Sequence, residues 1–531
     1  MRERVVENWL TSSNERTLQV PFCQLLLSEG YRVLHLSRHG EMEQGKDIIA
    51  VDPDGRPCGF QLKHAKGGKI RQRDWETFKA QIDRLVELPI KHPAVPRGRQ
   101  HRALLVTNGE LDEPVRTEIV DRNEVWSRKG LPTLEVITKG DLLNRFQELQ
   151  TNFWPSEVCD INALLELFLA DGSACLDKAK CAGLMESTLP LLRRRVGKAE
   201  CKRAIASAAV FASYMLQSHQ ARGNHVAEVE GWVVYLAYLL ALVERQGLGD
   251  RYYQGSLEVA EFAIRQSLLD LCDELRERAH LIEGSGPADP PFYQPRITWL
   301  CGLLATLGLW RLHDGQQNER DTFIREFILA HRDKLMLWGE AALPQILAVL
   351  WYLRYAMGTA EPDAMLGALI RSVTTACLAH PGRGLPDPYH DIEEVVMKTL
   401  CLDGSRWEET HAGRSYGLET LVQLFARRNW RREMRWLWPD VSRVNYCTFT
   451  PDHQWQLCWW RSESGDLVTR QPSRTQSWSE LRKQAESVDH SKIPALLCDR
   501  PWVLLLFLIV YPHRLSPEPA KLLDGYWSTL Y

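Results

Sequence analysis

Two short extended runs joined by a tight turn are the feature that most constrains the fold of this chain. Residues 48–51 are aliphatic and mostly β-branched, residues 52–55 read Asp-Pro-Asp-Gly, and residues 59–63 are again suited to a strand. Pro, Asp and Gly are the residues that turns prefer, and runs of this length between turns are typical of strands. The segment therefore predicts a β-hairpin.

The ends of this hairpin carry three polar side chains. Side chains two positions apart on a strand share a face, so Gln61 and Lys63 should project together beside Asp47, with Leu62 turned to the core. Carboxylate and amide oxygens suit a hard cation such as Mg²⁺. A neighbouring lysine can lower the pKa of a bound water or stabilise negative charge developing on a phosphate. The combination indicates the chemistry of phosphodiester hydrolysis.

The hairpin belongs to a longer pattern that covers roughly the first quarter of the chain. In order, this pattern contains Asn14-Glu15-Arg16 on a first helix, residues 25–33, Gly45-Lys46-Asp47, Gln61-Leu62-Lys63, residues 103–109 before a helical stretch, and residues 134–143. It resembles the PD-(D/E)xK nucleases, and more narrowly their Mrr-type restriction endonuclease branch. The resemblance implies an α/β/α domain of the restriction-endonuclease type.

Carried over residue by residue, the resemblance implies that Asp47 is the principal metal ligand, Gln61 the second ligand and Lys63 the catalytic lysine. Glu15 would be the first-helix acid that joins the site. The implied cofactor is Mg²⁺, for which Mn²⁺ can substitute. Many relatives have Glu where this chain has Gln61, although Gln occurs in the Mrr-type branch. An amide offers a lone pair without a charge, so the use of one metal ion or two stays open.

Four other residues near these positions could take part in a site. His39, Glu43 and His64 lie close in sequence to the expected ligands, but such residues are more often found in loops or on the surface. Glu29 is a rival to Glu15, yet it precedes Gly30, where a helix should end, and a solvated position is expected there.

A concentration of positive charge follows the second strand. Residues 56–102 hold twelve Lys or Arg and four Asp or Glu, in a chain whose formal net charge is −3. The segment from Lys66 to Arg73 combines two glycines with clustered cations, and its candidate nucleic-acid contacts are Lys66, Lys69, Arg71 and Arg73. Cations of this kind bind a phosphate backbone without reading sequence. A solvated helix face is the alternative for each single residue.

Composition limits the rest of the chain. With 531 residues, 44% of them hydrophobic and 25% charged, the chain is expected to form about three globular domains. The 13 cysteines include no C-x-x-C pair, which argues against zinc and, without a signal peptide, favours reduced thiols in the cytoplasm. The apolar run 502–511 is about half the length of a membrane span and predicts a buried helix or strand, so no membrane is expected. No phosphate-binding loop of the Walker type is present, so any ATP-dependent step would need a partner.

Three regions are predicted. Residues 1–150 form the nuclease-like domain and residues 151–420 a helical, solenoid-like or bundle-like domain, in which segments such as 233–243 have helical spacing but no fixed repeat period. Residues 421–531 are rich in Trp and Arg. Interleaved cations and aromatics, as in residues 427–438, can stack bases and hold phosphates, but a helix with its tryptophans in the core and its arginines in solvent is the favoured interpretation.

The fold class expected is thus multidomain α+β, and the function expected is a metal-dependent endonuclease. By the resemblance, its substrate is double-stranded DNA and its setting is prokaryotic restriction or antiphage defence. The helical region would regulate it through a second copy of the chain or a partner protein. Two alternatives stay open: a catalytically inactive nucleic-acid-binding scaffold, and a nuclease of the same fold that acts on RNA or branched DNA.

Overall fold

The chain forms two compact units, Met1–Gln266 and Ser267–Tyr531. The computed structural model describes residues 2–37, 45–95, 99–155, 157–193, 195–278, 290–315, 319–379, 384–399, 413–473 and 475–529. The structure is mixed α and β and 66% helical, which confirms the coarse fold class. The predicted boundaries at residues 150 and 420 lie inside these units and stay predictions.

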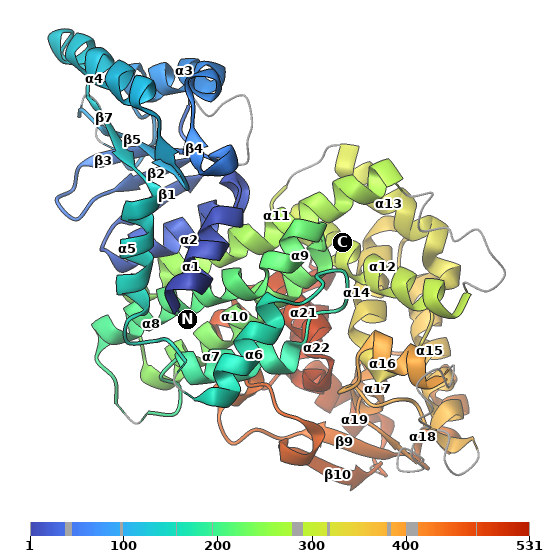
Figure 1. Ribbon diagram of the computed structural model, residues 1–531. Helices are drawn as coiled ribbons and strands as arrows, with labels where there is room; N and C mark the ends of the chain where they lie inside the picture. The colour runs from blue at the N-terminus through green and yellow to red at the C-terminus, as the bar shows by residue number, and fades with distance from the viewer. Residues whose placement is uncertain are drawn as a thin grey trace. The chain divides into compact units, whose positions relative to one another are not determined.

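The first unit contains a five-stranded sheet of order β1-β2-β3-β5-β7 (Figure 1). β1, β2 and β3 pair antiparallel, whereas β3, β5 and β7 pair parallel. The strands are β1 Arg32–Leu36, β2 Ile48–Val51, β3 Pro57–Lys63, β5 Arg102–Thr107 and β7 Leu134–Ile137; a separate parallel pair is formed by β4 Lys69–Ile70 and β6 Glu110–Leu111. The parallel strands need crossover connections, and helices supply them.

The predicted hairpin is confirmed as β2 and β3, which pair from Ile48 opposite Phe60 to Val51 opposite Pro57. The turn between them is stabilised by Asp52, whose carboxylate accepts from the backbone N–H of Arg56 at 2.7 Å. This short-range contact is the reason a Pro, Asp and Gly sequence turns the chain here.

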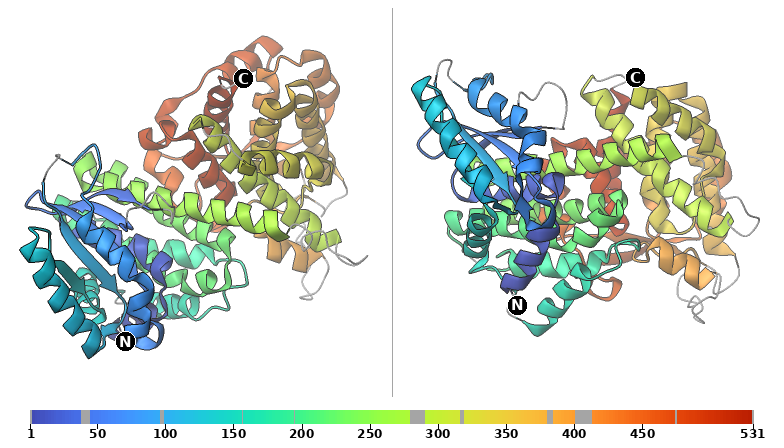
Figure 2. Two further views of the ribbon diagram at one scale, coloured as in Figure 1. Left: turned by 90° about the horizontal axis from the view of Figure 1, so that it is seen from above. Right: turned by 45° about the horizontal axis from the view of Figure 1, so that its top comes forward.

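Helices cover both faces of the sheet (Figures 1 and 2). On one face, α3 Gln72–Glu87 and α4 Glu113–Arg128 pack over β5, forming an apolar core that includes Trp75, Leu85 and Leu105. On the other face, Phe22 of α2 meets Phe60 of β3 with ring centroids 5.5 Å apart. The helices on this second side are α1 Arg2–Ser12, α2 Glu15–Ser28 and α5 Lys139–Gln150. Alternate residues of β3 therefore face different helical layers.

The rest of the first unit is helical, and α8 packs against α2. These helices are α6 Val158–Phe168, α7 Lys178–Thr188, α8 Lys198–Met215, α9 Gln217–Arg222, α10 His225–Gln246 and α11 Gln254–Arg278, within which the boundary between units falls. Among the described residues, only α10 is long and apolar enough to cross a membrane, and 89% of its most apolar window is buried. This burial is that of a core helix.

The second unit is built mainly of helices, in which α12 packs against both α14 and α13. Its first helices are α12 Pro290–His313, α13 Glu319–His331, α14 Leu343–Met357, α15 Ala360–Leu378 and α16 Ile392–Thr399. Its later helices are α17 Leu418–Arg427, α18 Arg431–Val441, α19 Trp478–Glu486, α20 Ala495–Cys498, α21 Pro501–Val510 and α22 Pro517–Ser528. The apolar run near residue 505 is thus a buried helix, α21, as expected.

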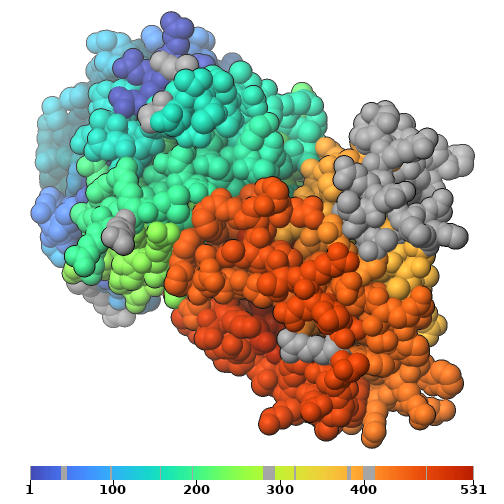
Figure 3. Space-filling model, turned by 90° about the horizontal axis from the view of Figure 1, so that it is seen from below, coloured from blue at the N-terminus to red at the C-terminus, as the bar shows by residue number. Residues whose placement is uncertain are grey.

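A three-stranded sheet of order β10-β9-β8 lies in the C-terminal part of the second unit, coloured orange to red in Figure 3. Its strands are β8 Arg414–Ser415, β9 Asn445–Phe449 and β10 Val468–Pro472. β9 and β10 pair antiparallel, and Gly465, which lies before β10, is part of a short helical turn.

Candidate functional site

The sequence-predicted side chains meet at the carboxyl end of β3. Asp47 directly precedes β2, which runs antiparallel to β3, so it lies beside the last residues of that strand. Glu15 comes from the first turn of α2, where Asn14 caps the helix by accepting from the backbone N–H of Thr17 at 2.9 Å. Three separate segments therefore supply the site, and the acid expected on the first helix lies at the start of the second.

Asp47 is 3% exposed and is held by two donors from β3. Its Oδ2 accepts from the side-chain amide of Gln61 at 2.7 Å and from the backbone N–H of Leu62 at 2.6 Å. β2 pairs with β3 only as far as Phe60. Beyond that point the Asp47 carboxylate, rather than a strand carbonyl, accepts the hydrogen bond from the β3 backbone. A buried carboxylate requires such partners, because leaving it without them would be costly.

The backbone of Asp47 is fixed from the opposite side by α2. The amide of Gln19, one turn after Glu15, donates to the carbonyl oxygens of Asp47 at 3.2 Å and of Ser37 at 3.1 Å. Gln19 is buried at 3% exposure. Helix α2 thus carries one acid of the site, Glu15, and through Gln19 fixes the backbone at the other acid, Asp47.

Lys63 and Glu15 form the second half of the site. Lys63 Nζ lies 3.2 Å from Glu15 Oε2, and Glu15 Oε1 accepts from the backbone N–H of His64 at 3.3 Å. The Lys63 ammonium also lies 5.6 Å from the ring centroid of Phe78, on α3. Gln61 and Lys63 both lie on the α3 face of the sheet, as the two-residue period predicts, and the ammonium is held at the end of the strand between an acid and an aromatic ring.

Asn108 joins the ends of β3 and β5. Its Oδ1 accepts from the backbone N–H of Ala65 at 2.9 Å, and its Nδ2 donates to the carbonyl oxygen of Ser13 at 2.7 Å. The His64 ring Nδ1 lies 3.0 Å from the same Nδ2 and 3.0 Å from the Ser13 oxygen. Sequence reasoning missed Asn108 and Gln19. The sequence did offer a signal for Asn108, which is a polar residue directly after the strand-like run 103–107. Residues at the ends of strands commonly belong to functional sites.

The segment with clustered cations leaves β3 directly. Gly67 and Gly68 have φ of 69° and 79°, and a Cβ on either would meet nothing within 4 Å. The loop packs closely against Gly109, where an added Cβ would lie 2.3 Å from the Ala65 Cβ and 2.7 Å from the Gly68 oxygen. The left-handed backbone and this close approach both require glycine.

The four cations of this segment are all exposed. Lys69 Nζ lies 3.7 Å from an Asp112 oxygen. Within the described part of the chain, no ion pair involves the side chain of Lys66, Arg71 or Arg73. Three solvated cations therefore lie within ten residues of Lys63, available to an anionic partner.

Lys46, next to Asp47, is buried at 2% exposure and points elsewhere. Its Nζ donates to the carbonyl oxygens of Leu88 at 2.9 Å and Arg84 at 3.4 Å, at the carboxyl end of α3. Gly59 gives it room, since an added Cβ there would lie 3.2 Å from the Lys46 side chain. Burial lowers the pKa of Lys46 to about 8. Its position at the negative end of a helix dipole makes it a structural cation.

The remaining residues considered from sequence fall outside this cluster. Glu29 ends α2 and forms an ion pair with Arg145, so it is a surface partner as expected. His39 and Glu43 lie outside the described residues. Across the residues that the structure does describe, no group of three His, Cys, Asp or Glu side chains is placed to hold a metal ion. The oxygen donors of this site are two carboxylates and one amide.

No family model matches the chain, and neither the curated proteins nor the solved structures include one with significant similarity.

Proposed function

We propose that the first unit is a metal-dependent nuclease that hydrolyses phosphodiester bonds of DNA. The observation that carries the proposal is the meeting of Asp47, Gln61, Lys63 and Glu15, from three segments, at the end of one strand. An acid, an amide and an ammonium in one small volume, with solvated cations beside them, match what phosphodiester hydrolysis needs. A structural ion pair alone would not require the buried Asp47 and Gln61 pair next to it.

The donor set fits a hard divalent cation such as Mg²⁺ or Mn²⁺, because all its ligands are oxygens and two carry charge. Asp47 and Glu15 would hold the cation through their carboxylates, and Gln61 through its amide oxygen. When bound, such an ion supplies Lewis acidity and charge neutralisation at the phosphate.

Each protein group has its own task in this proposal. Lys63 provides the positive charge that stabilises the phosphate as negative charge develops on it, and Glu15 holds that ammonium in place at 3.2 Å. Gln61 and the Leu62 backbone N–H fix the orientation of the Asp47 carboxylate. Lys66, Arg71 and Arg73 bind the phosphate backbone next to the cut, which gives affinity without sequence preference.

The test is cleavage of plasmid, linear duplex, single-stranded DNA and RNA by the full chain with Mg²⁺ or Mn²⁺. Lys63→Met and Asp47→Asn should each reduce the rate by about 100-fold or more. The matched controls are Lys129→Met and Asp54→Asn, which change the same side chains at exposed positions outside the site. Metal-dependent cleavage that is lost in the first pair and kept in the second supports the proposal; equal cleavage by all four variants rejects it.

A second candidate function is a binding module that does not cleave. One observation favours it: Asp47 already accepts from two donors in β3. This alternative predicts DNA binding that survives Asp47→Asn and is lost when Lys66, Arg71 and Arg73 are replaced by Glu. The substrate panel also separates DNA cleavage from cleavage of RNA or branched DNA.

A further inference from the structure

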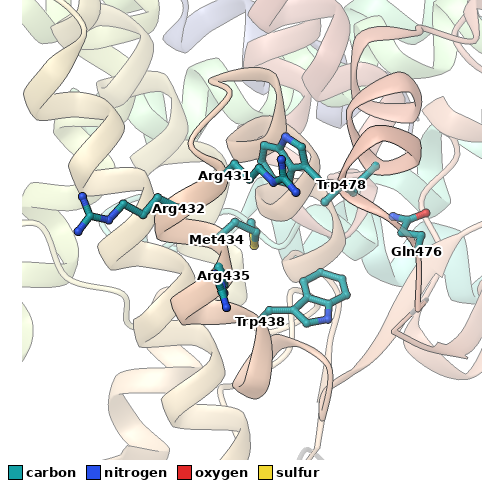
Figure 4. A pocket seen from close by; sticks show the side chains of 8 residues that line it. Arg431, Arg432, Met434, Arg435, Trp438, Gln476 and Trp478 are labelled. Atoms are coloured by element: carbon teal, nitrogen blue, oxygen red, sulfur yellow. The ribbon is translucent and has the colours of Figure 1, made fainter.

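A pocket of about 540 Å³ lies in the second unit between α18 and α19 (Figure 4). Its walls combine arginine and tryptophan over an apolar floor. The lining residues are Arg431, Arg432, Met434, Arg435, Trp438, Gln476, Trp478 and Leu481. A volume of this size is in the range of roughly 300–1,000 Å³ that holds small organic ligands.

The helical repeat brings the lining of α18 together. Arg431, Arg435 and Trp438 are spaced by four and three residues, so they share one face of the helix. In Figure 4, Trp438 and Trp478 both lie to the right of α18, whereas the Arg432 side chain extends to the left. Met434 and Leu481, buried at 3% and 4% exposure, form the floor. The pocket thus has two cations and two indole rings facing one volume.

The arginines of this pocket differ from those just before them in the chain. Arg427 and Arg428 are committed to the buried Asp524, at 2.9 Å and 3.0 Å. By contrast, the structure, as far as it describes the chain, gives no ion pair or hydrogen bond to the side chains of Arg431 and Arg435. A pair of guanidinium groups without carboxylates makes the pocket selective for an anion.

The nearby acids do not neutralise this charge. Glu480, on α19, is engaged at its own helix start, where it accepts from the backbone N–H of Ser477 at 2.8 Å. Asp440 lies 4.0 Å from Arg443, beyond the pocket on α18. Glu433 is exposed and does not line the pocket.

The tryptophans correct the favoured sequence interpretation of α18. Trp436 is 75% exposed, and Trp438 and Trp478 are only half-buried, so the indoles of this helix pair are not core residues. The buried positions of α18 are Met434, Leu437 and Val441 instead. Half-buried indole faces next to guanidinium groups offer a surface on which a flat ring can stack.

We propose that this pocket binds a nucleotide, with its phosphate on Arg431 and Arg435 and its base against Trp438 and Trp478. The phosphate of a nucleotide would pair with the two guanidinium groups, and its base would stack on the two indoles. Neither a phosphate alone nor a base alone would use both kinds of side chain. The nucleotide can be a free mononucleotide or the phosphorylated end of a nucleic-acid strand, since both present the same chemistry. This inference does not depend on the proposed cleavage by the first unit.

The experiment is calorimetric titration of the full chain in EDTA, which keeps divalent cations from supporting cleavage. The probes are adenosine monophosphate, adenosine, inorganic phosphate, and a ten-residue oligothymidylate with and without a 5′-phosphate. Saturable binding of adenosine monophosphate that exceeds that of adenosine and of phosphate is expected for a free nucleotide. Binding confined to the 5′-phosphorylated strand identifies a strand end as the source.

The variants Arg435→Ala and Trp438→Ala should each weaken this binding by about tenfold or more. Their matched controls on the same helix region are Arg443→Ala, which lies outside the pocket, and Trp436→Ala, whose indole is exposed. Circular dichroism checks that all four variants keep the helical content of the parent. The proposal is overturned by absence of saturable binding of every probe, by phosphate binding as tightly as the nucleotide, or by equal affinity in Arg435→Ala, Trp438→Ala and their controls.

Discussion

Lys63 and Glu15 stand 48 residues apart in the sequence, yet Lys63 Nζ lies 3.2 Å from Glu15 Oε2. The contact depends on α2 presenting its first turn to the end of β3, and Glu15 also accepts from the backbone N–H of His64. The Glu15 carboxylate thus fixes the position of the Lys63 ammonium and also that of the first residues of the loop that carries the exposed cations. If the first unit cleaves DNA, this acid is a positioning group as well as a ligand.

Replacing Glu15 with Gln should therefore lower the cleavage rate without unfolding the domain. The amide keeps the size of the side chain but loses the charge that holds Lys63, and misplacement of a reacting group by about 1 Å costs about 100-fold. Cleavage rates and metal-free DNA binding are measured together. Glu29→Gln, at the other end of α2, is the control; a loss of rate that is the same for both variants would contradict a specific role.

Gly109→Ala should destabilise the first unit by about 1–3 kcal/mol, because the new methyl collides with Ala65 and with the Gly68 carbonyl. The matched control is Gly183→Ala in α7, where an added Cβ meets nothing. That change should stabilise by about 0.5–1 kcal/mol, since alanine loses less entropy in a helix. Urea unfolding of the two variants and the parent measures the difference in the free energy of unfolding. An unchanged value for Gly109→Ala would show that the loop moves to make room for the methyl group.

Lys46 should make stability depend on pH between about 8 and its ordinary value of 10.5. In the folded state burial lowers its pKa to about 8, so in this window the unfolded chain binds a proton that the folded chain does not. Stability therefore rises with pH through the window. The Lys46→Met variant should lack this rise. His101, which neighbours Lys46, also has a lowered pKa and titrates at lower pH, so its contribution is separable.

Glu340 should produce the opposite slope at lower pH in the second unit. It is buried, and burial raises its pKa to about 7, although it accepts from the backbone N–H groups of Tyr416 and Gly417. Between its ordinary pKa of 4.5 and about 7, the folded chain keeps a proton that the unfolded chain loses, so stability falls as pH rises. The difference in melting temperature between parent and Glu340→Gln, followed from pH 4.5 to 7, should track this loss; a constant difference would argue against it.

Replacing Lys66, Arg71 and Arg73 together with Ala should weaken DNA binding and reduce its salt dependence. Each phosphate contact contributes about 0.9 to the slope of log affinity against log salt for duplex DNA. A triple variant at Arg116, Arg128 and Lys129, exposed cations on or next to α4, controls for net charge. Filter binding at several salt concentrations measures the slope for each triple variant. Equal slopes in the two variants would show that the loop with Lys66, Arg71 and Arg73 does not contact DNA.

The parts of the fold that sequence predicted are those set by neighbouring residues. The turn after β2 rests on Asp52 and Arg56, four residues apart, and α10, which contains residues 233–243, shows its helical spacing within a single segment. Local patterns of this kind can be read directly. The extent of the compact units could not, because it depends on packing such as that of α2 on α8.

The candidate site divides in the same way. Asp47, Gln61 and Lys63 could be named because one hairpin carries them, and Glu15 because it fitted a resemblance. Gln19 could not, since its partners are backbone oxygens 18 and 28 residues away. Asn108 follows a strand, but its role depends on a backbone N–H 43 residues away. The interpretation that places the tryptophans of α18 in a core is wrong, because Trp436 is 75% exposed although indoles are mostly buried.

The close approach at Gly109 gives a way to search for distant relatives. Ala65 and Asn108 are joined by a hydrogen bond, and the residue after Asn108 has no space for a side chain. A chain that keeps this junction needs a small residue two positions after the end of β3 and an N-G pair directly after the neighbouring parallel strand β5. This two-part signature rests on steric exclusion, so it would find chains that share the junction whether or not they keep Asp47, Gln61 and Lys63.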